Sequence, residues 1–283
     1  MAKGCKVLQV MLIVGLVVSG LAKERHKEKI EKTIAFSSAS DEKELIVDNI
    51  RGSIVVEGYD GDKVQMVVHK SISARNERKM QRAKEEVILD IEEKDNQVIL
   101  YVDAPYREPN GSINYRGYRH YGYEVTHDFE LKVPFKTNIW IKTINDGEIS
   151  VKNVDGLFDL ENINGGIEAF GLSGSGRVYA LNGAVRVEFK KNPEKRCYFG
   201  SLNGEIEVTF LPGLQADMRF KTFNGEVYSD FPVTYLQPRA PIKKRRGAKF
   251  VYKADKSFGA RVGEGGPELE FDGFNGDIYV VKK

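Results

Sequence analysis

The 283-residue chain has little of several residue types that often define a function. It has two cysteines and four histidines, so it shows neither a disulfide framework nor the spacing of a zinc site. It contains no phosphate-binding loop, dinucleotide fingerprint or nucleophile elbow. These absences argue against nucleotide-dependent, redox and metal enzymes, and we expect no cofactor and no metal.

The first 22 residues have the pattern of a secretion signal. Lys3 and Lys6 precede an apolar stretch from Val7 to Val18, and Gly20-Leu21-Ala22 supplies small residues for cleavage. The apolar stretch is short for a membrane span, although an uncleaved anchor stays an alternative. We therefore expect a signal peptide over 1–22 and an exported protein, located in the periplasm, on the outer surface or in the medium.

The mature chain is formally neutral. Removing two lysines with the signal lowers Lys+Arg from 43 to 41, against 41 Asp+Glu, so no general attraction to nucleic acid is expected. Membrane contact is expected only through the signal or a basic loop. Cys5 leaves with the signal, and Cys197 is interpreted as a half-buried strand cysteine rather than a reactive thiol or one that pairs with another chain.

A repeated phrase is the main positive feature of the sequence. Its glycines fall at 147, 165, 183, 204 and 225, at intervals of 18, 18, 21 and 21, and a late copy has its glycine at 276. The residues two and four places after the glycine are mostly apolar, whereas those between them are mostly polar or small, which predicts a half-buried strand. We expect Asn and Gly to form tight turns by adopting positive φ. The predicted turn residues are Asn164, Gly165, Asn182, Gly183, Asn203, Gly204, Asn224, Gly225, Asn275 and Gly276.

Two architectures fit this phrase. Asn-Gly between alternating apolar residues is a strong hairpin signal, which would give an antiparallel meander. The strong strand consistently follows the turn, however, and constant spacing with constant polarity favours stacked coils. We therefore predict a mainly all-β protein, a single-stranded β-solenoid or β-helix-like stack of short strands, with one helix near the N-terminal part.

The repeats divide the mature chain. Residues 23–32 are expected to form a flexible leader, and 33–143 a β-rich part with a helix over 73–86, where helix formers occur without Gly or Pro. The section 144–283 carries the repeats and a basic insertion at 236–270. The helix is expected to cover an end of the sheet, because open edges need protection.

Two irregular segments are candidate binding sites, although a plain surface loop is the alternative for each. A Tyr-rich loop over 105–123 places aromatic rings beside arginines, a combination that suits sugar or protein contacts. The basic insertion suits an anionic polymer or lipid headgroups. The candidate residues are Tyr115, Tyr118, Arg119, Tyr121 and Tyr123 in the loop, and Lys243, Lys244, Arg245 and Arg246 in the insertion.

The residues also carry a family resemblance. A signal sequence, the stretch from Gly52 to Asp62 (Gly-Ser-Ile-Val-Val-Glu-Gly-Tyr-Asp-Gly-Asp), a polar helix and serial Asn-Gly-x-Ile/Val strands resemble the bacterial putative adhesin family. That family is a domain of unknown function with predicted β-strand repeats. The resemblance runs over about 33–281 and is strongest at 144–229. It implies surface attachment, with an envelope polysaccharide or an envelope or surface protein as partner, and it carries no catalytic residues.

A carbohydrate-active β-helix enzyme is the alternative hypothesis. Glu205 and Glu226 each follow the glycine of the phrase, and consecutive coils would place them roughly 5 Å apart. Such a pair can act as acid and base in a polysaccharide lyase or hydrolase. A solvated charged face is the simpler interpretation, so we expect no catalytic residues.

Overall fold

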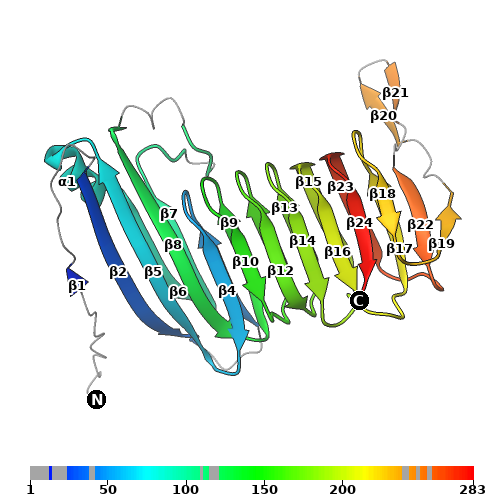
Figure 1. Ribbon diagram of the computed structural model, residues 1–283, viewed down its shortest axis with the longest axis horizontal. Helices are drawn as coiled ribbons and strands as arrows, with labels where there is room; N and C mark the ends of the chain where they lie inside the picture. Colours follow the sequence, from blue (N-terminus) through cyan, green and yellow to red (C-terminus); the bar gives the residue numbers. More distant parts are fainter. Residues whose placement is uncertain are drawn as a thin grey trace.

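The computed structural model shows a mainly β protein built from two large mixed sheets that face each other (Figure 1). It describes residues 13–14, 24–37, 42–108, 111–114, 121–237, 242–246, 249–253 and 257–283. Most of the expected signal, 1–22, lies outside these residues. The prediction of a mainly β chain with a helix near its N-terminal part is confirmed at this level.

The first sheet, sheet A, has eleven strands in the order β1-β2-β5-β8-β4-β10-β12-β14-β16-β24-β18. Its strands are β1 (Ile13–Val14), β2 (Glu24–Ala35), β5 (Lys63–Ala74), β8 (Tyr123–Pro134), β4 (Ile54–Tyr59), β10 (Ile149–Lys152), β12 (Ile167–Leu172), β14 (Val185–Phe189), β16 (Ile206–Phe210), β24 (Ile278–Lys282) and β18 (Val227–Ser229).

The second sheet, sheet B, also has eleven strands, in the order β19-β22-β17-β23-β15-β13-β11-β9-β3-β7-β6. They are β19 (Val233–Leu236), β22 (Phe258–Val262), β17 (Ala216–Lys221), β23 (Glu268–Asn275), β15 (Cys197–Asn203), β13 (Gly176–Ala180), β11 (Phe158–Asn162), β9 (Thr137–Thr143), β3 (Lys43–Asp48), β7 (Gln97–Asp103) and β6 (Ile88–Lys94). A separate hairpin joins β20 (Ile242–Arg246) to β21 (Lys249–Lys253).

From β9 to β18 the chain changes sheet after every strand. Equivalent phrase positions therefore stack in parallel register, as Ile149 on Ile167, Ile167 on Val185 and Val185 on Ile206. The strands before and after each Asn-Gly turn lie in different sheets, so the antiparallel meander is wrong.

The core lies between the two sheets. Inward residues alternate with outward ones along each strand, as in β14, where Val185, Val187 and Phe189 are buried. Phe189 stacks on Phe210 at 5.2 Å, and Phe199 packs on Phe271 at the same separation. Each repeat contributes one strand to each sheet, and we call such a pair of successive strands a coil. The coils together bury one continuous apolar layer that no single coil could bury alone.

The last two strands lie inside the stack. In sheet A, β24 pairs with β16 on one side and β18 on the other. In sheet B, β23 lies between β15 and β17. After β16 the chain therefore skips one position in each sheet and forms β17 and β18 one position further on. It then returns through β22, and β23 and β24 fill the two skipped positions.

The N-terminal part differs from its expected outline in two places. Residues 24–35 form β2, paired along its length with β5, so a flexible leader over 23–32 is wrong. The helix, α1, spans Glu77–Glu86 and begins later than expected, because residues up to Ala74 continue β5. Asn76 caps it by accepting a hydrogen bond from the Lys79 N–H. Helix α1 buries Met80 and Ala83 and contacts β2, β5 and β8 at the end of sheet A.

Candidate binding surface

The asparagines of the phrase form a continuous ladder along the turns. Each side-chain amide donates to the side-chain oxygen of the asparagine in the neighbouring coil, at 2.7–3.0 Å, and these asparagines from Asn164 on are exposed. Stacked asparagines of this kind support parallel in-register strands. The ladder follows spatial rather than sequence order: Asn145, Asn164, Asn182, Asn203, Asn275 and Asn224.

The glycines are required for close approach, and the expectation of positive φ is wrong for all predicted turn residues except Gly276, whose φ is 137°. A Cβ on any of the six phrase glycines would lie 2.0–2.4 Å from a carbonyl group of the glycine in the adjacent coil. For Gly165 the contact is the carbonyl oxygen of Gly147, at 2.0 Å. Glycine is therefore required by the close approach of the backbone in the adjacent coil, rather than by the conformation of the turn.

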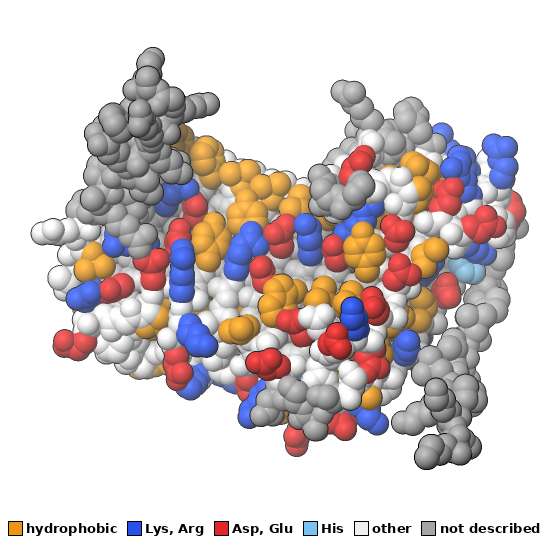
Figure 2. Space-filling model, turned by 180° about the vertical axis from the view of Figure 1, so that it is seen from behind, with side chains coloured by type: hydrophobic (Ala, Val, Ile, Leu, Met, Phe, Trp, Pro, Cys, Tyr) orange, Lys and Arg blue, Asp and Glu red, His pale blue; other side chains and the backbone are white. Residues whose placement is uncertain are grey.

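A row of apolar side chains follows the ladder, because the residue before each phrase asparagine is apolar. This row grows more exposed toward the C-terminal end of the stack. Ile144 is buried, Leu202 is 36% exposed, and Phe274 and Phe223 are 43% and 69% exposed. Figure 2 shows hydrophobic side chains along the upper rim, over the turns that join the sheets. The two phenylalanine rings stack at 5.0 Å with an interplanar angle of 6°.

A second aromatic pair lies on the outer face of sheet A in the same two coils. Tyr228 and Tyr279 stack at 5.1 Å and 9°. The Tyr228 hydroxyl donates to the Glu226 carboxylate at 2.7 Å, and this bond, together with the charge of Glu226, raises the pKa of Tyr228 to about 12. Tyr279 donates to Asp277 at 3.2 Å, and its pKa is raised by burial and then by this bond.

Residues 223–228 and 274–279 therefore form two parallel segments with matching side chains, which we call the paired-segment surface. Each segment presents Phe, Asn, an acid and Tyr in the same order. The sequence predicted the asparagines and glycines of these segments as turn residues and Glu226 as a possible acid, but their phenylalanines and tyrosines were not among the predicted binding residues. The signal was present, because only these two copies of the phrase have Phe before Asn-Gly and Tyr after the acid.

The carboxylates of this surface do not have the predicted neighbours. Because β24 lies between β16 and β18, Asp277 separates Glu205 from Glu226, so the expected Glu205–Glu226 contact is wrong. Asp277 also accepts a hydrogen bond from the Glu226 N–H at 2.8 Å. The three acids lie in one column on one face.

The outer face of sheet B pairs its charges internally. Arg177 donates to Asp159 and to Glu161, both at 3.1 Å, and Lys142 contacts Glu161 at 3.2 Å. Burial raises the pKa of Glu161, but the two cations oppose it and the net pKa lies below the usual range. The Arg177 guanidinium also lies 5.0 Å from the ring centroid of Tyr179. The charges of these four residues are therefore paired with one another rather than left for a charged ligand.

The Tyr-rich loop is described only in part: Tyr115, Tyr118 and Arg119 lie outside the described residues. Tyr123 is buried and donates to Glu86 of α1 at 2.6 Å, so an exposed contact is wrong for this residue. Tyr121 packs edge-on against Tyr123 and lies 5.4 Å from the Arg82 guanidinium. These two rings attach the loop to the helix.

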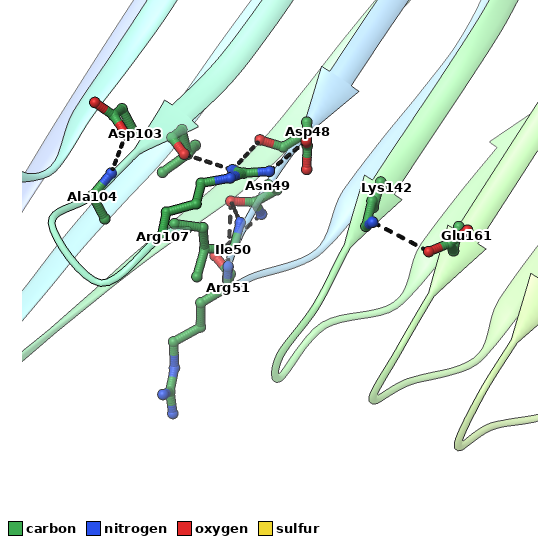
Figure 3. A network of polar contacts seen from close by, with 10 residues as sticks. Asp48, Asn49, Ile50, Arg51, Asp103, Ala104, Arg107, Lys142 and Glu161 are labelled. Atoms are coloured by element: carbon green, nitrogen blue, oxygen red, sulfur yellow. Dashed lines mark hydrogen bonds and ion pairs between the residues drawn. The ribbon is translucent and has the colours of Figure 1, made fainter. Parts of the chain in front are cut away.

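Arg107, which begins the same loop, fixes it to sheet B. Its side chain is 1% exposed, forms an ion pair with Asp48, and donates to the Val102 carbonyl at 2.7 Å (Figure 3). Its guanidinium lies 4.2 Å from the Tyr101 ring centroid. This arginine has a structural role at the ends of β3 and β7.

The candidate residues of the basic insertion belong to a hairpin. Lys243, Lys244, Arg245 and Arg246 lie in β20, which pairs with β21. Their side chains lie outside the described parts, so their binding role stays a prediction.

A polar row crosses the inner face of sheet A in the N-terminal part. Glu28, Lys70 and His127 are cross-strand neighbours on β2, β5 and β8. Lys70 Nζ donates to the Val87 carbonyl at 3.0 Å, and burial lowers its pKa. His127 is 1% exposed, and neither ring nitrogen has a hydrogen-bond partner among the described residues. Burial, with a smaller effect of Lys70, lowers the pKa of His127 to about 3.

Cys197 lies on a strand, β15, as expected, but it is fully buried rather than half-buried, and burial raises the pKa of its thiol to about 11. Within the described ranges, no group of three or more His, Cys, Asp or Glu side chains is placed to hold a metal ion. The same ranges contain no helix that is both long enough and apolar enough to span a bilayer.

No protein-family profile and no curated protein sequence matches the chain. Solved structures similar to it include a protein of Clostridium sporogenes described as a putative cell adhesion protein, at 12% identity, covering 89% of this chain and 100% of that one, with a TM-score of 0.38. A putative adhesin of Bacteroides fragilis matches at 9% identity, covering 90% and 97%, with a TM-score of 0.35. A putative lipid binding protein of Parabacteroides distasonis matches at 11% identity, covering 90% and 96%, with a TM-score of 0.24.

Proposed function

We propose that the chain is an exported, non-catalytic binding protein of the bacterial cell envelope with an adhesin-like role, and that its paired-segment surface binds an extended polysaccharide. The observation that carries this proposal is the exposed, in-register pairing of aromatic rings, amides and acids in residues 223–228 and 274–279. Aromatic side chains cover the apolar faces of sugar rings, while amides and carboxylates accept or donate hydrogen bonds to hydroxyl groups.

The geometry of the acids supports binding rather than hydrolysis. Glycosidases use two carboxyl groups that flank the scissile bond from opposite sides. Glu205, Asp277 and Glu226 lie instead side by side in a column on the same face of sheet A. Three acids without a basic residue in that column also favour a neutral polysaccharide over an anionic one.

The proposal includes a β-solenoid for residues 144–283, in which one strand from each sheet makes a coil. The alternation of strands between the sheets and their parallel register support this arrangement. It also includes export with cleavage after Ala22, which would leave β2 intact from Glu24 onward. An intact mass of the exported protein that still contained residues 1–22 would contradict the cleavage.

Affinity electrophoresis through gels that contain neutral glucans, together with sedimentation on insoluble peptidoglycan, tests the binding proposal. We expect Phe223→Ala and Tyr228→Ala to weaken retention more than about tenfold, because each removes an exposed aromatic anchor. Phe135→Ala is the matched control, since Phe135 is 36% exposed and lies outside the paired-segment surface. Equal retention of all three variants would contradict the proposal. Release of reducing ends that Asp277→Asn abolishes would favour the enzyme hypothesis instead.

A further inference from the structure

The two sheets end at different places at the C-terminal end of the stack. Strands β17 and β18 belong to the same coil, and β18 is the last strand of sheet A. Sheet B continues past β17 with β22 and then β19 (Figure 1). Sheet B is therefore two strands longer than sheet A at this end.

The rows of core residues on the inner face of sheet B continue onto the two extra strands, β22 and β19. Ala216, Val262 and Val233 form one cross-strand row, and Met218, Ala260 and Tyr235 form the next. Directly opposed residues of antiparallel strands point to the same face, so Val233 and Tyr235 lie on the core side of the sheet. The first two members of each row are buried, but Val233 is 37% exposed and Tyr235 78% exposed.

Strand β18 also has an edge that no other strand of the described residues pairs with. The carbonyls of Asn224 and Glu226 accept from Gly276 and Ile278 of the preceding coil. Alternate residues of a strand bond to opposite neighbours, so the backbone groups of Gly225 and Val227 face outward. The short sheet thus ends beside β19 of the long sheet, whose inward side chains Val233 and Tyr235 are exposed.

The opposite end of the stack is protected. Apart from the two-residue β1, which pairs with β2, its outermost strands are β2 (Glu-Arg-His-Lys-Glu-Lys-Ile-Glu-Lys-Thr-Ile-Ala) and β6 (Ile-Leu-Asp-Ile-Glu-Glu-Lys), and both are rich in charge; α1 packs at the end of sheet A. Charged edges and covering elements prevent unwanted strand pairing. By contrast, β19 (Val-Thr-Tyr-Leu) has no charged residue.

From this asymmetry we infer that the C-terminal end is a homodimer interface, occupied by a second copy of this chain. In such a dimer, a two-fold axis that runs parallel to the strands relates the two copies, and it superposes sheet A of one copy on the level of sheet B of the other. It therefore places the long sheet B of one copy against the short sheet A of the other, on both sides at once.

Successive strands joined by short turns run in opposite directions, so β18 of one copy pairs antiparallel with β19 of the other. The exposed inner side of β19, with Val233 and Tyr235, then packs against the extension of sheet B in the other copy. One isologous contact thus pairs both free edges of each molecule, β18 of sheet A and β19 of sheet B. A single strand from an unrelated protein would pair with one of these edges and leave the other open. The outer face of sheet A, with Tyr228 and Tyr279, stays accessible in this dimer, so the inference does not depend on the proposed function.

Sedimentation velocity of the full chain over a concentration series tests the dimer. We expect a mass of two chains that falls to one on dilution. The double variant Val233→Lys, Tyr235→Lys should raise the dimer Kd more than about tenfold, because it places charge at the centre of the contact. Ile88→Lys is the matched control, since Ile88 is 48% exposed on β6, the edge strand at the other end of sheet B, and should leave the mass unchanged.

A wild-type chain that stays monomeric at every soluble concentration would overturn the inference, and so would a dimer that only Ile88→Lys dissociates. Circular dichroism checks that the double variant folds. If the double variant does not fold, hydrogen exchange of the wild-type chain at several concentrations tests the dimer instead. Faster exchange of the β18 and β19 amides on dilution, with unchanged exchange in β2 and β6, supports the dimer, and concentration-independent exchange in all four strands contradicts it.

Discussion

For single residues, contacts with the neighbouring coil determine which amino acids the repeated phrase contains. Asparagine is used because its amide can both donate and accept along the ladder, and glycine because a carbonyl of the adjacent coil lies where a Cβ would be. Both residue types are usually interpreted through turn conformation. Here the contact with the adjacent coil explains them better, since Gly276 alone among the six phrase glycines has a positive φ.

Two adjacent glycines allow a direct test of this explanation. Gly165→Ala should lower the free energy of unfolding by about 1–3 kcal/mol, because the new methyl group would overlap the Gly147 carbonyl oxygen at 2.0 Å. Gly166→Ala is the control, since its nearest neighbour is 3.3 Å away and Ala184 already occupies the equivalent position one coil later. Urea unfolding measures both variants. Equal losses would show that conformational freedom, rather than close approach, sets the requirement for glycine.

At the element scale, the main finding is the order of the strands. Local pattern was enough to predict the strands of the phrase, because alternation of apolar and polar residues is a local property. It could not predict that β24 lies between β16 and β18. Every copy of the phrase presents the same backbone and asparagine to its neighbour, so sequence order does not determine spatial order across the 51 residues between Gly225 and Gly276.

Equivalent positions in neighbouring coils test this order. Ile278 is fully buried between two strands, so Ile278→Ala should cost about 2–5 kcal/mol of unfolding free energy. Val227 holds the same phrase position on the edge strand and is only partly buried, so Val227→Ala should cost less than Val185→Ala, the same change inside the stack. Thermal or urea unfolding gives the three values. A small loss for Ile278→Ala with a large one for Val227→Ala would place β24 at the edge instead.

At the scale of the whole molecule, the repeat section and the N-terminal part stabilise the protein differently. The repeat section buries matched apolar rows, whereas the N-terminal part also encloses the row of Glu28, Lys70 and His127. No period in the sequence indicated that row, because its members are far apart along the chain and meet only through pairing of long strands. The paired-segment surface could not be predicted from the sequence either, because its two segments are distant in the chain and become neighbours only through the pairing of β18 with β24.

His127 makes stability depend on pH. Its pKa is about 3 in the folded protein and 6.5 in an unfolded chain, so between these values the unfolded state binds a proton that the folded state does not. The unfolding free energy should therefore fall as pH decreases from 6.5 toward 3, with about 1.4 kcal/mol per pH unit coming from this group. His127→Phe should flatten the dependence, and His69→Phe, at an exposed position on β5, should not. Denaturant unfolding at pH 7 and pH 5 compares them, and parallel pH profiles for all three proteins would contradict the assignment.

The inserted position of β23 and β24 also bears on synthesis and quality control. A ribosome makes β23 and β24 after β17 and β18, yet these two strands form an interior layer that separates coils made earlier. The stack therefore cannot be completed in the order of translation. A product that ends early, by a nonsense codon or by proteolysis, would lack an inner layer rather than a terminal one, and β17 and β18 would have no partner on that side. Completion of the stack therefore requires that translation has passed β24.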